Sequence, residues 1–326
     1  MDGPLLGLLV GILQGILEWL PVSSEGGVTL ALSALGVAAE EATAFALVLH
    51  GGTAVAATVY YRATLADLLA RVPDWRPGSA FQAGTADLSF YVLATLASGV
   101  TGVSGFLLLE ELASVLAGGA FLALIGVLLL VTGALLWIGE REEARQERSK
   151  VAAGAGQDGD AGAGQDGDAV AGQDGAVQRD DAQRDDAHGD DPTGGSGGFL
   201  AARSRPTAVD AVLVGLLQGL AVLPGISRSG TTVSALLLRG HDGPAAIQLS
   251  FVLSIPAALG AGTIAYLETG LPGISPTAAG VALVASAVVG YATVDGLTRL
   301  ARRLAFSRIC VGFGTLAIVG GVLVVV

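Results

Sequence analysis

Residues 224–232 read P-G-I-S-R-S-G-T-T and place a basic residue, Arg228, inside an otherwise apolar stretch. If this stretch lies in a membrane, the guanidinium costs at least about 2.5–3.5 kcal/mol and needs partners. Pro and Gly permit a tight turn, and the helix expected after the turn starts with free N–H groups. With hydroxyls and a forked cation, these groups form an anion cradle, for which phosphate is the natural guest. The candidate binding groups are Ser227, Ser229, Gly230, Thr231 and Thr232.

A second polar cluster lies in residues 14–26, which read Q-G-I-L-E-W-L-P-V-S-S-E-G. Glu18 follows Gln14 by four residues, so both side chains face one side of a helix. Glu18 could hold Mg²⁺ or Ca²⁺, because hard cations prefer oxygen ligands. It could instead act as a general base on Ser24. The hydroxyl and carboxyl groups that complete this cluster after Pro21 are Ser23, Ser24 and Glu25.

Simpler structural interpretations stay open beside these chemical ones. An ion pair between Arg228 and Glu18 could serve only to lock the two stretches together. Glu25 could be a water-exposed residue at the mouth of its turn. The remaining polar candidates, each serving either the packing or the site, are Gln14 and Gln218 as paired hydrogen-bonding groups and His50 as a buried histidine or a proton carrier.

The elements that position these residues are membrane helices. The 326 residues are 52% hydrophobic and only 14% charged, which excludes an ordinary soluble domain. Residues 5–35 and 209–239 are apolar but cut in the middle by Pro, Ser and Gly, so each half is too short to cross ~30 Å of hydrocarbon. They are predicted to form re-entrant helical hairpins. Six uninterrupted apolar runs are predicted to span the membrane, at about 42–61, 88–108, 114–138, 244–267, 277–297 and 309–326.

Basic residues predict the orientation of these spans. With six crossings and two hairpins, the Arg-rich loops all fall on one side, and the opposite loops carry Glu without Lys or Arg. The positive-inside rule therefore places both termini outside a cell membrane that the chain crosses several times. The basic residues that carry this prediction are Arg62, Arg71, Arg76, Arg141, Arg145, Arg148, Lys150, Arg203, Arg205, Arg239, Arg299, Arg302, Arg303 and Arg308.

An acidic insert separates two membrane segments. Residues 139–207 contain repeated A-G-Q-D-G and Q-R-D-D-A units with few large apolar residues, so they are predicted to be a disordered cytoplasmic segment. Most of the net charge of −12 falls in this region. The predicted domains are a first membrane repeat (1–138), this insert (139–207) and a second membrane repeat (208–326). Abundant Asp and a single lysine favour a salt-adapted, halophilic host, with a high-GC genome as the alternative.

The two broken stretches are related by an internal repeat. Both contain G-x-x-Q-G, beginning at Gly11 and at Gly215, and both reach a glycine twelve residues after the glutamine. By the charge distribution, the first stretch enters the membrane from outside and the second from inside. The sequence thus predicts an all-α integral membrane fold with an inverted-topology repeat, whose site lies where the two broken segments meet.

The motifs at 14–26 and 224–232 resemble the two signatures of the undecaprenyl-diphosphatase family, the bacitracin-resistance membrane phosphatases. The resemblance covers both membrane segments and implies hydrolysis of a polyprenyl diphosphate, undecaprenyl- or dolichyl-like, to the monophosphate. This reaction recycles the lipid carrier of cell-surface glycan synthesis. The resemblance also implies Mg²⁺ or Ca²⁺ held by Glu18, and the catalytic residues Glu18, Ser24 and Arg228. The implied diphosphate-binding residues are Ser23, Ser227, Ser229, Gly230, Thr231 and Thr232.

The chain departs from the family pattern at two site positions. Gln14 stands where the family often has Glu, and Gly27 stands where it usually has a histidine. Glu25 or His50 could substitute for that histidine. A transporter or flippase for a lipid phosphate or small anion is the alternative function, because inverted repeats with broken helices also suit transport. Expected partners are the lipid substrate and membrane lipids, with a homodimer as an option and no nucleic acid.

Overall fold

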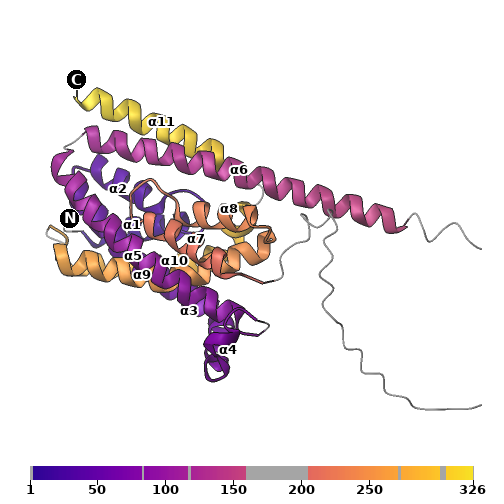
Figure 1. Cartoon of the computed structure of the whole chain (residues 1–326). Coiled ribbons are helices and arrows are strands. Elements are labelled where there is room, and N and C mark those ends of the chain that lie inside the picture. The colour runs from indigo at the N-terminus through magenta and orange to yellow at the C-terminus, as the bar shows by residue number, and fades with distance from the viewer. Residues whose placement is uncertain are drawn as a thin grey trace, which may run out of the picture. The chain divides into compact units, whose positions relative to one another are not determined.

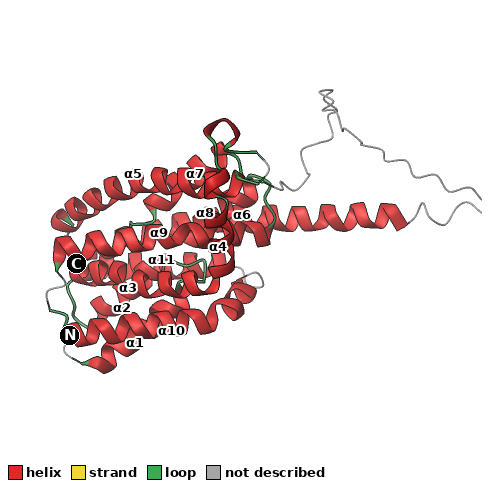
Figure 2. Cartoon of the chain, turned by 90° about the horizontal axis from the view of Figure 1, so that it is seen from below, coloured by secondary structure: helices red, strands yellow, loops and turns green. Residues whose placement is uncertain are grey.

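The computed structural model describes residues 3–82, 84–116, 119–158, 205–270, 273–301 and 306–325. Within these ranges all regular structure is helical (Figures 1 and 2). The elements are α1 (Pro4–Leu17), α2 (Ser24–Ala34), α3 (Ala39–Tyr60), α4 (Arg62–Ala70), the 3₁₀ turns η1 (Val72–Asp74) and η2 (Pro77–Ser79), α5 (Ala86–Val115), α6 (Gly119–Asp158), α7 (Ala208–Leu220), α8 (Arg228–Leu238), α9 (Gly243–Thr269), α10 (Pro276–Ala301) and α11 (Phe306–Val325).

Long apolar helices identify a multi-pass membrane protein. In the described ranges α3, α5, α6, α9 and α10 each have a stretch long and apolar enough to cross a bilayer. They correspond to the first five predicted spans. The sixth predicted span corresponds to α11, whose described apolar part, Phe306–Val322, is shorter than the other five.

The two broken stretches form helical hairpins with the break where Pro, Ser and Gly occur. α1 and α2 are separated at residues 18–23, and α7 and α8 at residues 221–227. Ser23 and Ser227 cap the helices that follow, since each side chain accepts a backbone N–H, from Gly26 and Gly230 respectively. Gly225 has φ +106°, a conformation that favours glycine.

The two halves of the chain use equivalent helix contacts. α1 packs along α10, and α7 packs along α5 (Figure 2). Both contacts are very close: a Cβ on Gly11 would lie 2.3 Å from the Ala282 carbonyl oxygen, and one on Gly215 would lie 2.4 Å from that of Ala94. α2 packs on α3 as α8 packs on α9, and α3 and α9 contact each other. These contacts bring the two helix breaks together.

The chain divides into two compact units. One unit joins residues Met1–Ala144 to Ala202–Val326, and the other is Arg145–Ala201. The predicted disorder of the insert is wrong for residues 139–158, because α6 continues as a helix to Asp158. Residues 159–204 lie outside the described residues, so for them it stays a prediction. The first unit holds both hairpins and the candidate site.

Candidate active site

Ser23 joins the two helix breaks. Its Oγ accepts the N–H of Gly26 at 3.0 Å as the cap of α2, and it also accepts the N–H of Gly225 at 3.0 Å from the other hairpin. Ser227 Oγ is the equivalent cap of α8 and accepts the N–H of Gly230 at 3.1 Å. Both serines therefore hold the backbone of the breaks in place, which is the role the structure assigns to two of the expected binding residues.

Glu18 and Arg228 form the ion pair at the centre of the site. Glu18 follows the last residue of α1 and Arg228 begins α8, so each charge is delivered by one hairpin. Arg228 Nη2 donates to Glu18 Oε1. The Arg228 side chain is 13% exposed and that of Glu18 is 4% exposed, so each charge is compensated mainly by the other rather than by solvent. The ion pair between Arg228 and Glu18, one of the two interpretations that the sequence left open, is therefore present.

The other oxygen of Glu18 collects further donors. Gln14 Nε2 and Ser24 Oγ each donate to Oε2 at 2.9 Å. His50 Nε2 lies 3.3 Å from the same oxygen. A carboxylate offers about four acceptor positions, and Arg228, Gln14 and Ser24 occupy three of them. Glu18 is thus held in one orientation beside the Ser24 hydroxyl.

His50 enters the site from α3. Its Nε2 lies 3.4 Å from Ser24 Oγ, and its Nδ1 lies 2.8 Å from the Ala46 carbonyl oxygen. Because a carbonyl only accepts hydrogen bonds, we assign a proton to Nδ1. His50 therefore points its other nitrogen at the hydroxyl and carboxylate, and the structure brings together all three members of this group.

Glu25 is buried rather than exposed at the mouth of the turn. It is 3% exposed, so the water-exposed interpretation is wrong. Its Oε1 is among the buried side-chain atoms of the described residues that have no hydrogen-bond partner. Glu25 lines a cavity of about 20 Å³, here called the polar cavity, together with Glu18, Ser24, His50 and Arg228. This volume holds one water-sized guest.

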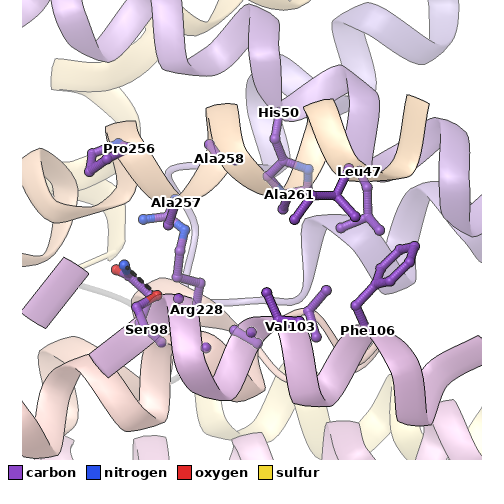
Figure 3. A pocket seen from close by; sticks show the side chains of 18 of the residues that line it. Leu47, His50, Ser98, Val103, Phe106, Arg228, Pro256, Ala257, Ala258 and Ala261 are labelled. Atoms are coloured by element: carbon purple, nitrogen blue, oxygen red, sulfur yellow. Dashed lines mark hydrogen bonds between the residues drawn. The ribbon is translucent and has the colours of Figure 1, made fainter. Parts of the chain in front are cut away.

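An apolar cavity of about 170 Å³ adjoins the polar one, since Glu25, His50 and Arg228 line both. Figure 3 shows the Arg228 side chain pointing toward Ala257 of α9; Val103 of α5 and His50 also line this cavity. An engineered cavity of about 150 Å³ binds benzene, so this one accommodates a short stretch of hydrocarbon. Arg228 Nη1 is buried without a hydrogen-bond partner, so a donor remains free beside it.

The hydroxyls after Arg228 mostly stabilise their own helix. Thr231 and Thr232 donate to the Arg228 carbonyl at 3.1 and 2.8 Å, and Thr232 Oγ1 lies 2.6 Å from Ser250 Oγ. Ser229 Oγ donates to the Leu20 carbonyl at 3.2 Å and so ties this hairpin to the other. Of the expected second-motif binding groups, Arg228 and Ser229 line the polar cavity.

Thr132 is a site residue that the sequence analysis missed. Its Oγ1 donates to the Gly225 carbonyl at 2.9 Å and accepts the Ser227 N–H at 3.0 Å. It thereby fixes the turn that carries Arg228. The only signal in the sequence is a single hydroxyl inside the apolar run of α6, which also fits an ordinary helix-interior threonine.

The two glutamines do not bond one hairpin to the other. Gln14 donates to Glu18 within its own hairpin. Gln218 Nε2 lies 3.3 Å from Ser98 Oγ and 3.2 Å from the Leu253 carbonyl, on α5 and α9. Gln218 lines the apolar cavity, and its Oε1 has no hydrogen-bond partner.

The oxygen-rich polar cavity fits a hard cation, with a restriction. No three His, Cys, Asp or Glu side chains in the described ranges gather as a preformed metal cluster. Glu18 is the expected ligand, but it already accepts hydrogen bonds from Arg228, Gln14 and Ser24. Glu25 Oε1 is buried and has no donor, which is the state of an oxygen that could take a cation.

Fold and site define a class: multi-pass helical membrane proteins in which two broken helical hairpins join an acidic and a basic residue beside an apolar cavity. The chain belongs to the family described as "Bacitracin resistance protein BacA", which matches residues 7–163 and 198–321. It is 45% identical to the undecaprenyl-diphosphatase of Haloarcula marismortui over 99% of both chains. The undecaprenyl-diphosphatase of Methanopyrus kandleri is 34% identical, over 95% of this chain and 93% of its own length. That of Methanococcoides burtonii is 31% identical, over 95% and 96%.

Proposed function

We propose that this protein is a membrane hydrolase that removes the terminal phosphate from a polyprenyl diphosphate and so recycles a lipid carrier of cell-surface glycan synthesis. Family membership and relatives named undecaprenyl-diphosphatase support this reaction. The observation that carries the proposal is the Glu18–Arg228 pair, which shares a polar cavity with Ser24 next to an apolar one. That arrangement suits a lipid with a phosphate head.

Substrate binding uses both cavities. The first part of the prenyl chain lies in the apolar cavity, and the diphosphate lies at its polar end beside Arg228. The free Nη1 of Arg228 donates to a phosphate oxygen, since a guanidinium binds phosphate with several N–H groups at once. The length of the remaining chain then lies outside the cavity, among membrane lipids.

The reaction is an attack by the Ser24 hydroxyl on the terminal phosphorus. Glu18 accepts the Ser24 proton along the existing 2.9 Å hydrogen bond, and the prenyl monophosphate leaves. Arg228 stabilises the charge on the phosphoryl oxygens, as phosphoryl transfer depends mainly on positioning and electrostatics. Water then releases phosphate from Ser24. His50, on α3, lies next to both the Ser24 hydroxyl and the Glu18 carboxylate and helps to position them.

A divalent cation, Mg²⁺ or Ca²⁺, is part of the proposal because of the family resemblance. The carboxyl oxygens of the polar cavity, from Glu18 and Glu25, are the groups available to hold it. When bound, it supplies positive charge that offsets the diphosphate.

The membrane topology belongs to the same proposal. α3, α5, α6, α9, α10 and α11 are the six crossings, and α1–α2 and α7–α8 are re-entrant hairpins that enter from opposite sides. The basic loops then face the cytoplasm, both termini lie outside, and the insert is cytoplasmic. Inverted-repeat membrane folds place their sites at such a meeting of broken helices. Both hairpins come from one chain, so the site does not require a homodimer.

The decisive experiment measures phosphate release by the purified protein in proteoliposomes. We expect release from farnesyl and undecaprenyl diphosphate when Mg²⁺ or Ca²⁺ is supplied. Ser24→Ala should lower kcat by at least about 10²-fold, because the nucleophile is lost. Lipid movement across the bilayer without phosphate release, unaffected by Ser24→Ala, would refute the proposal and support a flippase.

A further inference from the structure

Glu25 is the buried carboxyl group that the proposed reaction leaves unused. It is the second residue of α2 and is 3% exposed, and its Oε1 has no hydrogen-bond partner. A buried carboxylate without a partner is costly, so this group needs either a proton or a cation. Gln14 Oε1 is also buried without a partner, but Gln14 does not line the polar cavity, whereas Glu25 does.

Glu18 already accepts hydrogen bonds from three protein groups, so a cation there would compete with them. Arg228 occupies Oε1, and Gln14, Ser24 and His50 lie around Oε2. A cation on Glu18 would weaken these hydrogen bonds, and loss of the bond from Arg228 would break the ion pair between the two hairpins. Glu25 offers an oxygen in the same cavity at no such cost.

We infer that Glu25, rather than Glu18, is the protein ligand of the divalent cation in this chain. The inference rests on the proposed function for the other ligands, which are oxygens of the bound diphosphate and water. Mg²⁺ commonly binds in this way, through one or two carboxylates, substrate phosphates and several waters. The polar cavity of about 20 Å³ has room for one such ion, and Glu25 shares it with the phosphate-binding Arg228.

The different roles of Glu18 and Glu25 follow from how the charge of each is compensated. Glu18 is neutralised by Arg228 within the protein, whereas Oε1 of Glu25 has no hydrogen-bond partner and Glu25 lines the cavity into which the phosphates enter. A cation between Glu25 and the diphosphate would offset part of the negative charge of both. Glu18 then keeps its hydrogen bond to Ser24 throughout, so cation binding does not disturb the nucleophile.

The test measures Mn²⁺ binding to the full chain in detergent by electron paramagnetic resonance, with farnesyl methylenediphosphonate as an uncleavable diphosphate. Glu25→Gln should weaken Mn²⁺ binding at least tenfold, and Glu25→Asp should restore most of it. Glu18→Gln should change Mn²⁺ binding less than threefold. Glu111→Gln removes an exposed carboxylate of α5 and serves as the matched control. Elution as a single species and a cooperative thermal unfolding transition show that each variant is folded.

Two results would overturn the inference. One is Mn²⁺ binding by Glu25→Gln equal to the wild type, which is expected if Glu25 is held neutral by a proton. The other is loss of binding in folded Glu18→Gln with binding kept in Glu25→Gln. Either result leaves the proposed function intact if the wild type still releases phosphate. Absence of phosphate release by a wild type that binds Mn²⁺ would count against the proposed function instead.

Discussion

At the scale of single residues, the Glu18–Arg228 pair joins the two hairpins, and we propose that it also takes part in the reaction. Each partner is nearly buried, so removing one leaves an uncompensated charge inside the protein, which costs about 3–5 kcal/mol. The pair also connects the two hairpins, since Glu18 follows α1 and Arg228 begins α8. The structural and the catalytic interpretations of Arg228 are therefore complementary.

A double-mutant cycle separates these contributions. Arg228→Gln and Glu18→Gln should each lower the free energy of unfolding by about 3–5 kcal/mol. The double variant should lose less than the sum of the two single losses. The physical reason is that the double variant buries no unpaired charge. Thermal unfolding in detergent provides the measurement. Strictly additive losses would show that the two charges do not interact in the folded protein.

Sequence reasoning found the charged residues of the site but not the distribution of roles among the polar ones. Arg228 and Glu18 were recognisable because a charge inside apolar sequence needs a partner. Ser23 and Ser227 were expected to bind substrate, which stays a prediction; their oxygens also cap helices, and Ser23 lines the polar cavity. Thr132 acts through a tertiary contact from α6, so no local pattern around it could reveal its role.

At the scale of elements, each hairpin is positioned by a glycine-lined contact with a long helix. Gly11 of α1 and Gly215 of α7 face backbone carbonyls of α10 and α5 too closely for any side chain. The spacing of glycines and the breaks at Pro21 and Pro224 are visible in the sequence. The sequence does not reveal which long helix each hairpin packs on, because that depends on contacts between residues far apart in the chain.

Gly11→Val should separate α1 from α10 and so displace Glu18. A Cβ at this position would lie 2.3 Å from the Ala282 carbonyl oxygen, which a folded helix pair cannot accommodate without moving. We expect a lower Tm and reduced phosphate release. Gly280→Val is the matched control on α10, because a Cβ there meets nothing within 4 Å. Equal Tm values for the two variants would contradict the proposed close contact.

At the scale of the whole molecule, the machinery lies in one of the two compact units. Every residue placed in the site belongs to Met1–Ala144 or Ala202–Val326. Residues 159–204 hold more than half of the net negative charge of the chain but none of the site residues. Composition and apolar runs were enough to predict a multi-pass helical membrane protein, since they depend only on the bilayer as a solvent.

Replacing residues 159–204 with a short Gly-Ser linker should therefore leave kcat and KM within about twofold of the wild type. A flexible linker joins the membrane segments at little entropic cost, because loop closure depends only weakly on loop length. Phosphate release in proteoliposomes is the measurement. A loss of activity in a linker variant that elutes as a single species would assign the insert a part in catalysis.

The central claim is that the cavity joining Glu18, Ser24 and Arg228 hydrolyses a polyprenyl diphosphate. The most direct test is the rate of phosphate release from undecaprenyl diphosphate by folded wild type, Arg228→Gln and Glu111→Gln proteins side by side. We predict release by the wild type and by Glu111→Gln, and a fall in kcat of about 10²–10³-fold for Arg228→Gln, since it removes the main charge-stabilising donor. Wild-type rates in a folded Arg228→Gln protein would contradict the claim.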